Sequence, residues 1–225
     1  MLGLDLISLP AAVGFTLASF SDCPRPPPPS VQVDTQTLAP ETDFTPSLAD
    51  LKRLRVDSQI VRGIKNPHIS GITRSGVNVE FLVDYDGQVS GQQACLWVTE
   101  VRITVRSQPM VMIAREYPPG TCEHEAVMEH EMKHVRVDHN LVARYEERYR
   151  RAARQEANRL GVRYVSDLSR LQAVQKALED RMRGAIEGVS EDLMRVRNRF
   201  QNAVDRQSEY RRVRNKCSNW HHGGR

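Results

Sequence analysis

Hydrophobic and polar residues alternate along the middle of the chain. Over residues 77–83 every second side chain is apolar, which is typical of a strand with one buried face. A second alternating run covers residues 97–105, and a short apolar run covers residues 110–114. The Asp86-Gly87 pair is a turn signal that separates the first two runs. The pattern therefore predicts a small antiparallel sheet over residues 68–117.

The period of the apolar pattern changes after Thr121. Residues 121–160 contain neither Gly nor Pro, carry acidic residues at their start and end at Gly161, as expected for one long helix. Residues 166–214 repeat the heptad-like spacing. Two long helices joined by a short turn pack antiparallel. We therefore predict a helical hairpin over residues 121–216 and an α+β fold class.

The first 50 residues differ in character from the rest. Residues 6–20 are mostly apolar, too short a run to span a membrane but long enough for the core of a signal peptide. Asp5 stands where a signal peptide normally carries a positive charge, and a translation start further upstream would supply that charge. We predict a signal peptide at residues 1–21 and a proline-rich and polar linker or arm at residues 22–50. One folded domain follows at residues 51–217, and a flexible tail at residues 218–225.

Four cysteines are scattered along the chain, without a Cys-x-x-Cys pair. An even and widely spaced set suits two long-range disulfides in an oxidising compartment, and four free thiols are the alternative. We predict that Cys95 pairs with Cys122 and that Cys23 pairs with Cys217. Together with the leader, the cysteines predict a periplasmic or secreted protein.

Composition and charge narrow the class of protein. The chain has 225 residues, of which 40% are hydrophobic and 27% are charged, so collagen-like and wholly disordered proteins are excluded. The net charge is +4, and nine basic but only two acidic residues lie from Arg195 onwards. No basic motif with regularly interleaved aromatic residues accompanies this segment, so we expect a solvated helix face and no nucleic-acid partner. We expect no transmembrane helix in the mature protein, and the oligomeric state stays open.

The most informative motif is His130-Glu131-Met132-Lys133-His134, a His-Glu-x-x-His pattern within the first predicted helix. Residues four apart lie on one face of a helix, so both imidazoles can bind one zinc ion. Glu131 then lies beside the metal, where it can act as general base towards a water molecule. The motif predicts that residues 51–217 form a zincin-like domain that hydrolyses protein or peptide substrates.

A catalytic zinc site needs a third protein ligand, which we expect from the second helix. Simple hairpin geometry places the middle of the motif opposite residue 193 or its neighbours. This position favours an acidic residue, with three candidates: Glu187, Glu191 and Asp192.

Other polar residues near the motif can be sorted by helix geometry. Asp138 lies on nearly the same face as His134 but about 12 Å along the axis from His130, so it can support a ligand histidine and not share its metal. His139 and His124 lie well away from this face, and we expect both on the surface.

Two segments resemble an uncharacterised bacterial family of predicted secreted zinc-dependent proteases. One segment is residues 122–138, and the other is Val204-Asp205-Arg206-Gln207-Ser208-Glu209-Tyr210 followed by Cys217 and Trp220; the resemblance covers roughly residues 70–217. In the better-known branch of the family the late segment reads Tyr-Asp-x-x-Thr-x-His-Gly, and its His is the natural third ligand. This chain has Tyr210 at that position. The resemblance implies that Glu209 replaces the histidine as the third zinc ligand and that Tyr210 stabilises an oxyanion. Asp205 in the same segment is a further alternative.

Two functional hypotheses follow from the sequence. The first is a secreted or periplasmic zinc metallohydrolase, with peptidase activity the best match. In it, the strand ending near Glu116 pairs through its edge with an extended substrate. The second is a non-catalytic helical-hairpin protein of the envelope that works as a scaffold or interaction module. The metal content of untagged protein separates the two hypotheses.

Overall fold

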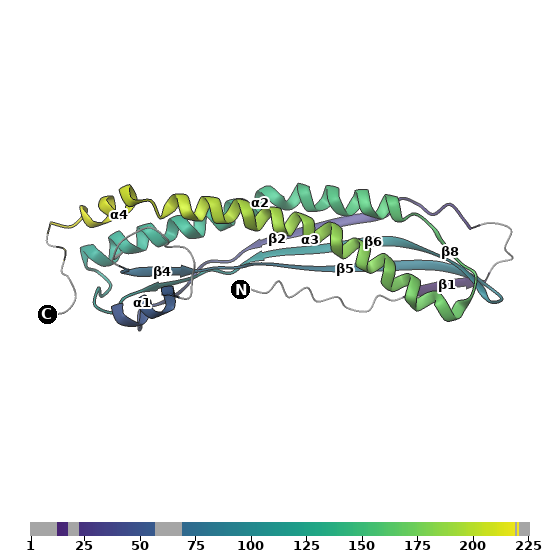
Figure 1. Ribbon diagram of the computed structural model, residues 1–225, viewed down its shortest axis with the longest axis horizontal. Coiled ribbons are helices and arrows are strands. Elements are labelled where there is room, and N and C mark those ends of the chain that lie inside the picture. The colour runs from purple at the N-terminus through teal and green to yellow at the C-terminus, as the bar shows by residue number, and fades with distance from the viewer. Residues whose placement is uncertain (1–12, 18–22, 57–68, 219, 221–225) are drawn as a thin grey trace. The chain divides into compact units, whose positions relative to one another are not determined.

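A computed structural model describes residues 13–17, 23–56, 69–218 and 220, and shows a mixed α/β protein with two sheets and long helices (Figure 1). The chain divides into two compact units. The first is formed by residues 1–36, 78–106 and 143–193, and the second by residues 37–77, 107–142 and 194–225. The candidate motif of the sequence lies in the second unit.

The sheet of the first unit has the strand order β1-β5-β6-β2, with β8 paired to β6. These strands are β1 (Val13–Leu17), β2 (Ser30–Thr37), β5 (Val77–Ser90), β6 (Gln93–Ser107) and β8 (Arg163–Val165). Strand β1 pairs with β5 in parallel, whereas β8 pairs with β6 antiparallel. The turn predicted at Asp86-Gly87 is wrong. Strand β5 continues through these residues, and the turn comes at Gly91, whose φ of 57° favours glycine.

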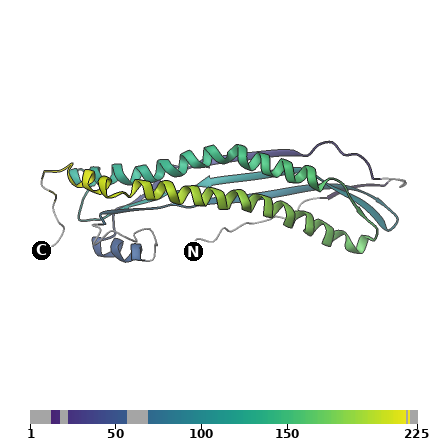
Figure 2. The same cartoon turned by 45° about the horizontal axis from the view of Figure 1, so that its top comes forward.

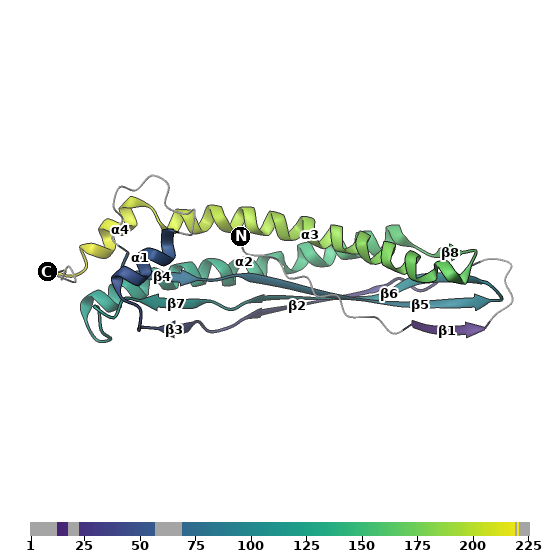
Figure 3. The same ribbon diagram turned by 60° about the horizontal axis from the view of Figure 1, so that its bottom comes forward.

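The sheet of the second unit has the strand order β3-β7-β4 and carries the helix α1 (Figure 3). Its elements are β3 (Glu41–Asp43), α1 (Leu48–Val56), β4 (Gly71–Arg74) and β7 (Met110–Ile113). Strand β7 pairs in parallel with β3 and antiparallel with β4. The predicted single antiparallel sheet over residues 68–117 is therefore inexact, because strands from outside that range join through parallel pairs.

Part of the predicted linker takes a regular structure. Residues 30–37 form β2 and residues 41–43 form β3, so the segment predicted as a linker or arm contributes strands to both sheets. These strands are polar, and side-chain hydrogen bonds secure them. Gln32 donates to the carboxylate of Glu100 at 2.7 Å. In β2 only Val31 and Val33 alternate with polar residues, and β3 has no apolar residue, so the strand signal in the sequence is short.

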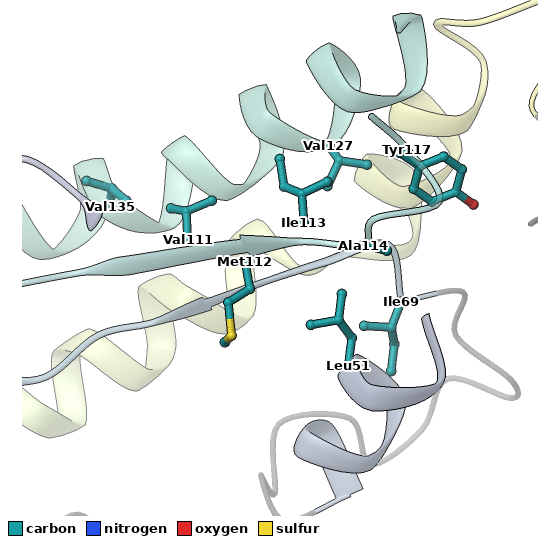
Figure 4. Close-up of a cluster of buried hydrophobic side chains, with 9 residues drawn as sticks. All are labelled: Leu51, Ile69, Val111, Met112, Ile113, Ala114, Tyr117, Val127 and Val135. Atoms are coloured by element: carbon teal, nitrogen blue, oxygen red, sulfur yellow. The ribbon is translucent and has the colours of Figure 1, made fainter. Parts of the chain in front are cut away.

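The core of the second unit lies on both faces of strand β7 (Figure 4). Val111 and Ile113 point towards α2 (Cys122–Leu160), where they meet side chains such as Val127. Met112 points to the opposite face, towards Leu51 of α1. The alternation of side chains along the strand thus packs the sheet between two helices, and α2 is held over β7 at the turn next to the motif.

Helix α2 has nearly the predicted bounds, but the second predicted helix is interrupted. It comprises the 3₁₀ helix η2 (Leu168–Arg170), α3 (Leu171–Val204) and α4 (Gln207–Arg214). Within the first unit α2 and α3 lie side by side (Figure 2), and the hydroxyls of Tyr149 and Ser190 are 3.0 Å apart. The hairpin over residues 121–216 as a whole stays a prediction, because its helices are divided between the two units.

The predicted signal peptide and tail fall largely outside the described residues. Of residues 1–21 only 13–17 are described, as strand β1, and of residues 218–225 only 218 and 220. The signal peptide therefore stays a prediction. No helix within the described ranges is apolar and long enough to cross a membrane.

All four cysteines form disulfides, as predicted, but the predicted pairing is wrong. Cys23 is bonded to Cys95, and Cys122 is bonded to Cys217. The reason lies in the topology. Cys95 stands on β6 and Cys23 precedes β2, the strand next to β6. Cys217 follows α4, and Cys122 is the first residue of α2. Each bond therefore joins two cysteines of one unit.

Two buried tyrosines of the first unit provide a matched test of the fold. The hydroxyl of Tyr149 pairs with Ser190, whereas the hydroxyl of Tyr85 has no hydrogen-bond partner among the described residues. We expect Tyr149→Phe to reduce the free energy of unfolding by about 1 kcal/mol at pH 7, because a net hydrogen bond is lost. Tyr85→Phe should be neutral or stabilising, because it removes an unsatisfied polar atom. Urea denaturation measures both, and equal losses would contradict the structure.

The same variants should behave alike in alkali. Burial raises the pKa of Tyr149 to about 12 and also raises the pKa of Tyr85, so the folded state favours the neutral phenols. The unfolded chain ionises first, near pH 10, and stability is therefore lost as the pH rises above 10 towards the folded-state pKa. Both phenylalanine variants should show a shallower loss than the wild type when unfolding is measured between pH 9 and pH 11.

Candidate metal centre

The two histidines of the motif lie one turn apart on α2 and are buried. Their ring centroids are 5.1 Å apart, and only 6% of His130 and 9% of His134 is exposed. Val127 and Val135 of the same helix are fixed in the core against β7. The packing of these valines sets the rotation of α2, which carries both imidazoles into a shared space.

Asp205, between α3 and α4, completes the group. Its Oδ1 lies 3.4 Å from Nε2 of His130 and 3.3 Å from Nε2 of His134. The three ligand atoms all lie within 4.8 Å of one another, so this group could hold a metal ion. Two atoms each about 2.0–2.1 Å from a tetrahedral zinc ion are roughly 3.3 Å apart, which fits the observed separations.

The electrostatics of the group favour an ionised carboxylate. Burial opposes ionisation of Asp205, but hydrogen bonds from His130 and His134 outweigh it and hold the pKa of Asp205 well below its ordinary value. Burial also lowers the pKa of His134, but the hydrogen bond to Asp205 and the charge of Glu131 reverse the effect and raise that pKa overall. Asp205 is thus ionised, the two Nε2 atoms converge on it, and it could serve as an anionic ligand.

His134 is held in place through a buried polar network. Its Nδ1 donates to Oε1 of Gln201, and Nε2 of Gln201 donates to Oδ1 of Asp138 at 2.7 Å. Arg197 binds the same carboxylate through two nitrogens, at 2.7 and 3.0 Å. Asp138 therefore supports His134 through Gln201 and not directly. Gln201 was not found from the sequence, because a single glutamine in a helix forms no motif.

Glu131 is placed by the neighbouring strand β4. The hydroxyl of Thr73 donates to Oε2 of Glu131 at 2.8 Å. A Cβ at Gly71 would lie 2.8 Å from Oε1 of Glu131, so the strand can approach this closely only with glycine there. Burial raises the pKa of Glu131, while the charges of His130 and His134 and the Thr73 hydrogen bond act against this rise. Neither Gly71 nor Thr73 was found from the sequence, since the strand is short.

Glu209, the preferred third ligand from the sequence, lies on the other side of His130. Its Oε1 is 3.4 Å from Nδ1 of His130 and also pairs with Lys133 and Arg212. The Arg212 hydrogen bond is the main reason that the pKa of Glu209 falls to about 2, with Lys133 and His130 acting in the same direction. Glu209 therefore supports His130, and the structure replaces it with Asp205 in the group that could hold a metal.

The interruption after α3 explains this replacement. A hairpin of straight helices favoured Glu187, Glu191 or Asp192, and none of these is a member of the group. Asp192 instead accepts hydrogen bonds from Tyr145 and Arg148. Helix α3 ends at Val204, so Asp205 lies in the bend before α4.

Tyr210 reaches the group from the first turn of α4. Its hydroxyl donates to Oδ1 of Asp205 at 3.1 Å, and its ring centroid lies 5.7 Å from that of His130. The O–H group thus points to the carboxylate that the histidines share, and the predicted role of Tyr210 in stabilising an oxyanion stays a prediction.

The other two histidines near the motif do not take part. His124, expected on the surface, is buried. Its Nδ1 lies 3.0 Å from the carbonyl oxygen of Tyr117, and its ring meets Phe44 edge-on. The expectation was wrong because the segment before α2 covers this side of the helix. His139 is half-buried.

The His130, His134 and Asp205 group opens into a cavity of about 290 Å³. Its walls come from β4, α2, α3 and α4 and include Glu131 and Tyr210. Buried side chains that could bind a metal, beside a cavity and next to a carboxylate of raised pKa, mark a candidate functional site.

Comparisons with protein-family models, with curated proteins and with solved structures gave no match to this chain. The description of the site therefore depends on its own geometry.

Replacement of each candidate carboxylate tests which one binds the metal. We expect Asp205→Asn to weaken zinc binding by more than about 100-fold, because loss of a supporting group alone costs roughly 10–100-fold. Glu209→Gln, which removes only a supporting group, should cost about 10–100-fold. Calorimetric titration with zinc in the presence of a competing chelator measures both. A larger loss of zinc affinity in Glu209→Gln than in Asp205→Asn would identify Glu209 as the ligand.

Gly71 and Gly76 allow a matched test of the contact between β4 and Glu131. In Gly71→Ala the new methyl group would lie 2.6 Å from Val127 and 2.8 Å from Glu131, whereas nothing lies within 4 Å of a Cβ at Gly76. We expect Gly71→Ala to reduce the free energy of unfolding by about 1–3 kcal/mol through overpacking. Gly76→Ala should change it by less than about 0.5 kcal/mol. Similar values for the two variants would rule out the close approach.

Proposed function

We propose that the protein is a zinc-dependent hydrolase that cleaves peptide bonds. The observation that carries the proposal is the convergence of His130 Nε2 and His134 Nε2 on Asp205 Oδ1, with the buried carboxylate of Glu131 beside them. The resemblance of residues 122–138 and 204–210, with Cys217 and Trp220, to predicted secreted zinc-dependent proteases agrees with this proposal.

The number and type of ligands favour a catalytic zinc ion. Structural zinc sites are normally closed by four protein ligands, whereas catalytic sites use three and leave one position for water or substrate. Here three ligand atoms gather at the wall of a cavity. Two histidines and a carboxylate also suit iron(II), but a general base on the same helical turn is typical of zinc hydrolases.

Each polar residue then has a defined role in peptide hydrolysis. Bound zinc supplies Lewis acidity, which lowers the pKa of water and polarises a carbonyl group. Glu131 accepts the proton of the attacking water and delivers it to the amine as the carbon–nitrogen bond breaks. The raised pKa of Glu131 suits both steps, because the carboxyl must gain and lose a proton near neutral pH. Tyr210 supplies an O–H donor for the charge that develops on the carbonyl oxygen.

The open edge of β4 favours an extended peptide as the substrate. The strand predicted to pair with substrate, β7, is flanked on both sides by β3 and β4, so that prediction is corrected to β4. Within the described residues no strand pairs with the other edge of β4, and Gly71 and Thr73 of this strand line the cavity. A peptide added there gains backbone hydrogen bonds beside Glu131.

The disulfides support a place outside the reducing cytosol. Cys23–Cys95 and Cys122–Cys217 account for every cysteine, and disulfides persist in the periplasm or outside the cell. We therefore propose a periplasmic or secreted enzyme.

A conservative substitution of the proposed base tests the function. Glu131→Gln should retain zinc and lose about 10²–10⁴-fold in the rate of hydrolysis of a denatured, fluorescently labelled protein, because only proton transfer is removed. Zinc content by mass spectrometry is the control. A variant as active as the wild type would refute the role of Glu131. Folded wild type that binds no zinc would favour the non-catalytic scaffold.

A further inference from the structure

The cavity beside the metal group, by which we mean His130, His134 and Asp205, has two chemically different ends. At one end the lining is aliphatic, from Ile69, Val127 and Val213. Val127 lies one turn before His130 on α2. At the other end, the amide end, the lining includes the amides of Asn198 and Asn202 and the guanidinium of Arg197, which is paired with Asp138. A substrate that lies across the metal group therefore meets an aliphatic surface on one side and hydrogen-bonding groups on the other.

The aliphatic end is a fixed part of the fold. Val213 is the buried residue of α4, and it packs in a small cluster with Ala126 of α2 and Cys217. The disulfide from Cys217 to Cys122 holds this cluster against the start of α2. Val127 belongs to the core around β7 and is only 2% exposed. The wall therefore has a defined shape, and the valines cannot turn away from the cavity at low cost.

Strand β4 gives the cavity a direction. Gly71 at its start lies against Val127 and Glu131, and Thr73 binds Glu131. Just beyond the strand, the carbonyl oxygen of Ser75 accepts a hydrogen bond from Arg197, which is next to Asn198. The strand thus runs from the aliphatic end to the amide end.

An antiparallel peptide on β4 runs in the opposite direction, from the amide end to the aliphatic end. Antiparallel pairing is slightly more stable per residue than parallel pairing. The part of the peptide that follows the cleaved bond then faces Ile69, Val127 and Val213. An ionised side chain there would lose its hydration against three aliphatic side chains, whereas an aliphatic side chain would be buried favourably against them.

We propose that this cleft selects an aliphatic side chain, such as that of valine or leucine, at the residue immediately after the cleaved bond, and that Val127 and Val213 determine the selection. The inference deepens the proposed peptidase function and rests on it. We expect weaker selectivity for the substrate residue at the amide end, because hydrogen-bonding groups accept many polar side chains.

Cleavage-site mapping tests the inference. The zinc-loaded full chain is incubated with a mixture of peptides of random sequence, and mass spectrometry identifies the new termini. We expect aliphatic residues after the cleaved bond at least 10-fold more often than aspartate or lysine. Val213→Ala should enlarge the pocket and shift the preference towards leucine and phenylalanine, and Val213→Leu should shift it towards alanine, each by about 10-fold or more.

Matched variants separate this inference from the proposed function. Asn202→Ala, at the other end of the cavity, should leave the preference after the cleaved bond unchanged. Cleavage by the wild type with no preference there, or with an aliphatic preference only before the bond, would overturn the inference and leave the peptidase function standing. If both Val213 variants cut at the wild-type sites, Val213 does not determine selection and the inference fails. Absence of cleavage by zinc-loaded wild type would overturn both proposals.

Discussion

One carboxylate shared by two imidazoles is the interaction on which the second unit depends. Asp205 lies in the bend between α3 and α4, and its Oδ1 is within 3.4 Å of both His130 and His134. A buried carboxylate is costly unless charged or hydrogen-bonded partners surround it. Hydrogen bonds offset this cost. Tyr210 donates to Asp205 itself, Gln201 pairs with His134, and Glu209 pairs with His130. The position of α4 and the position of the motif on α2 are therefore coupled through these contacts.

The buried hydrogen-bond network around His134 fixes the position of its imidazole. Asp138 is fully buried, and its carboxylate is satisfied by Arg197 and Gln201 together. Arg197 in turn binds the carbonyl oxygen of Ser75, just after β4. A fully satisfied buried network is rigid, because any rotation leaves a donor or acceptor without a partner. The imidazole of His134 is thus tied to the strand that borders the cavity.

The sequence predicted the parts of the site that lie on a regular helix. His130, Glu131 and His134 follow from a short motif whose geometry is fixed by the helical period, and the structure brings all three together. The long helix α2 was predicted almost to the residue, because its interior lacks Gly and Pro and it ends at Gly161. The position of Asp205, the third residue of the group, depends on where α3 ends.

No helix-breaking residue marks the interruption between α3 and α4 at Asp205. Neither Gly nor Pro stands between Val204 and Gln207, so heptad-like spacing predicts a continuous helix through the bend. Strand β4 was missed for a related reason. It is four residues long, and it contributes to the site through Gly71, where the lack of a Cβ lets the strand lie close to Glu131. The pairing of the cysteines depends on which strands and helices are neighbours, and local pattern does not contain that information.

The bond between Cys122 and Cys217 has a consequence for the maturation of the protein. It joins positions 95 residues apart, and the segment that carries Asp205, Tyr210 and Val213 lies inside the covalent ring. While the thiols are reduced, this segment is attached at only one end, through α3. Oxidation closes the ring and reduces the freedom of the unfolded chain. In the exported hydrolase proposed above, His130, His134 and Asp205 would therefore reach their final rigidity only after export, and the enzyme would have little activity in the compartment in which it is synthesised.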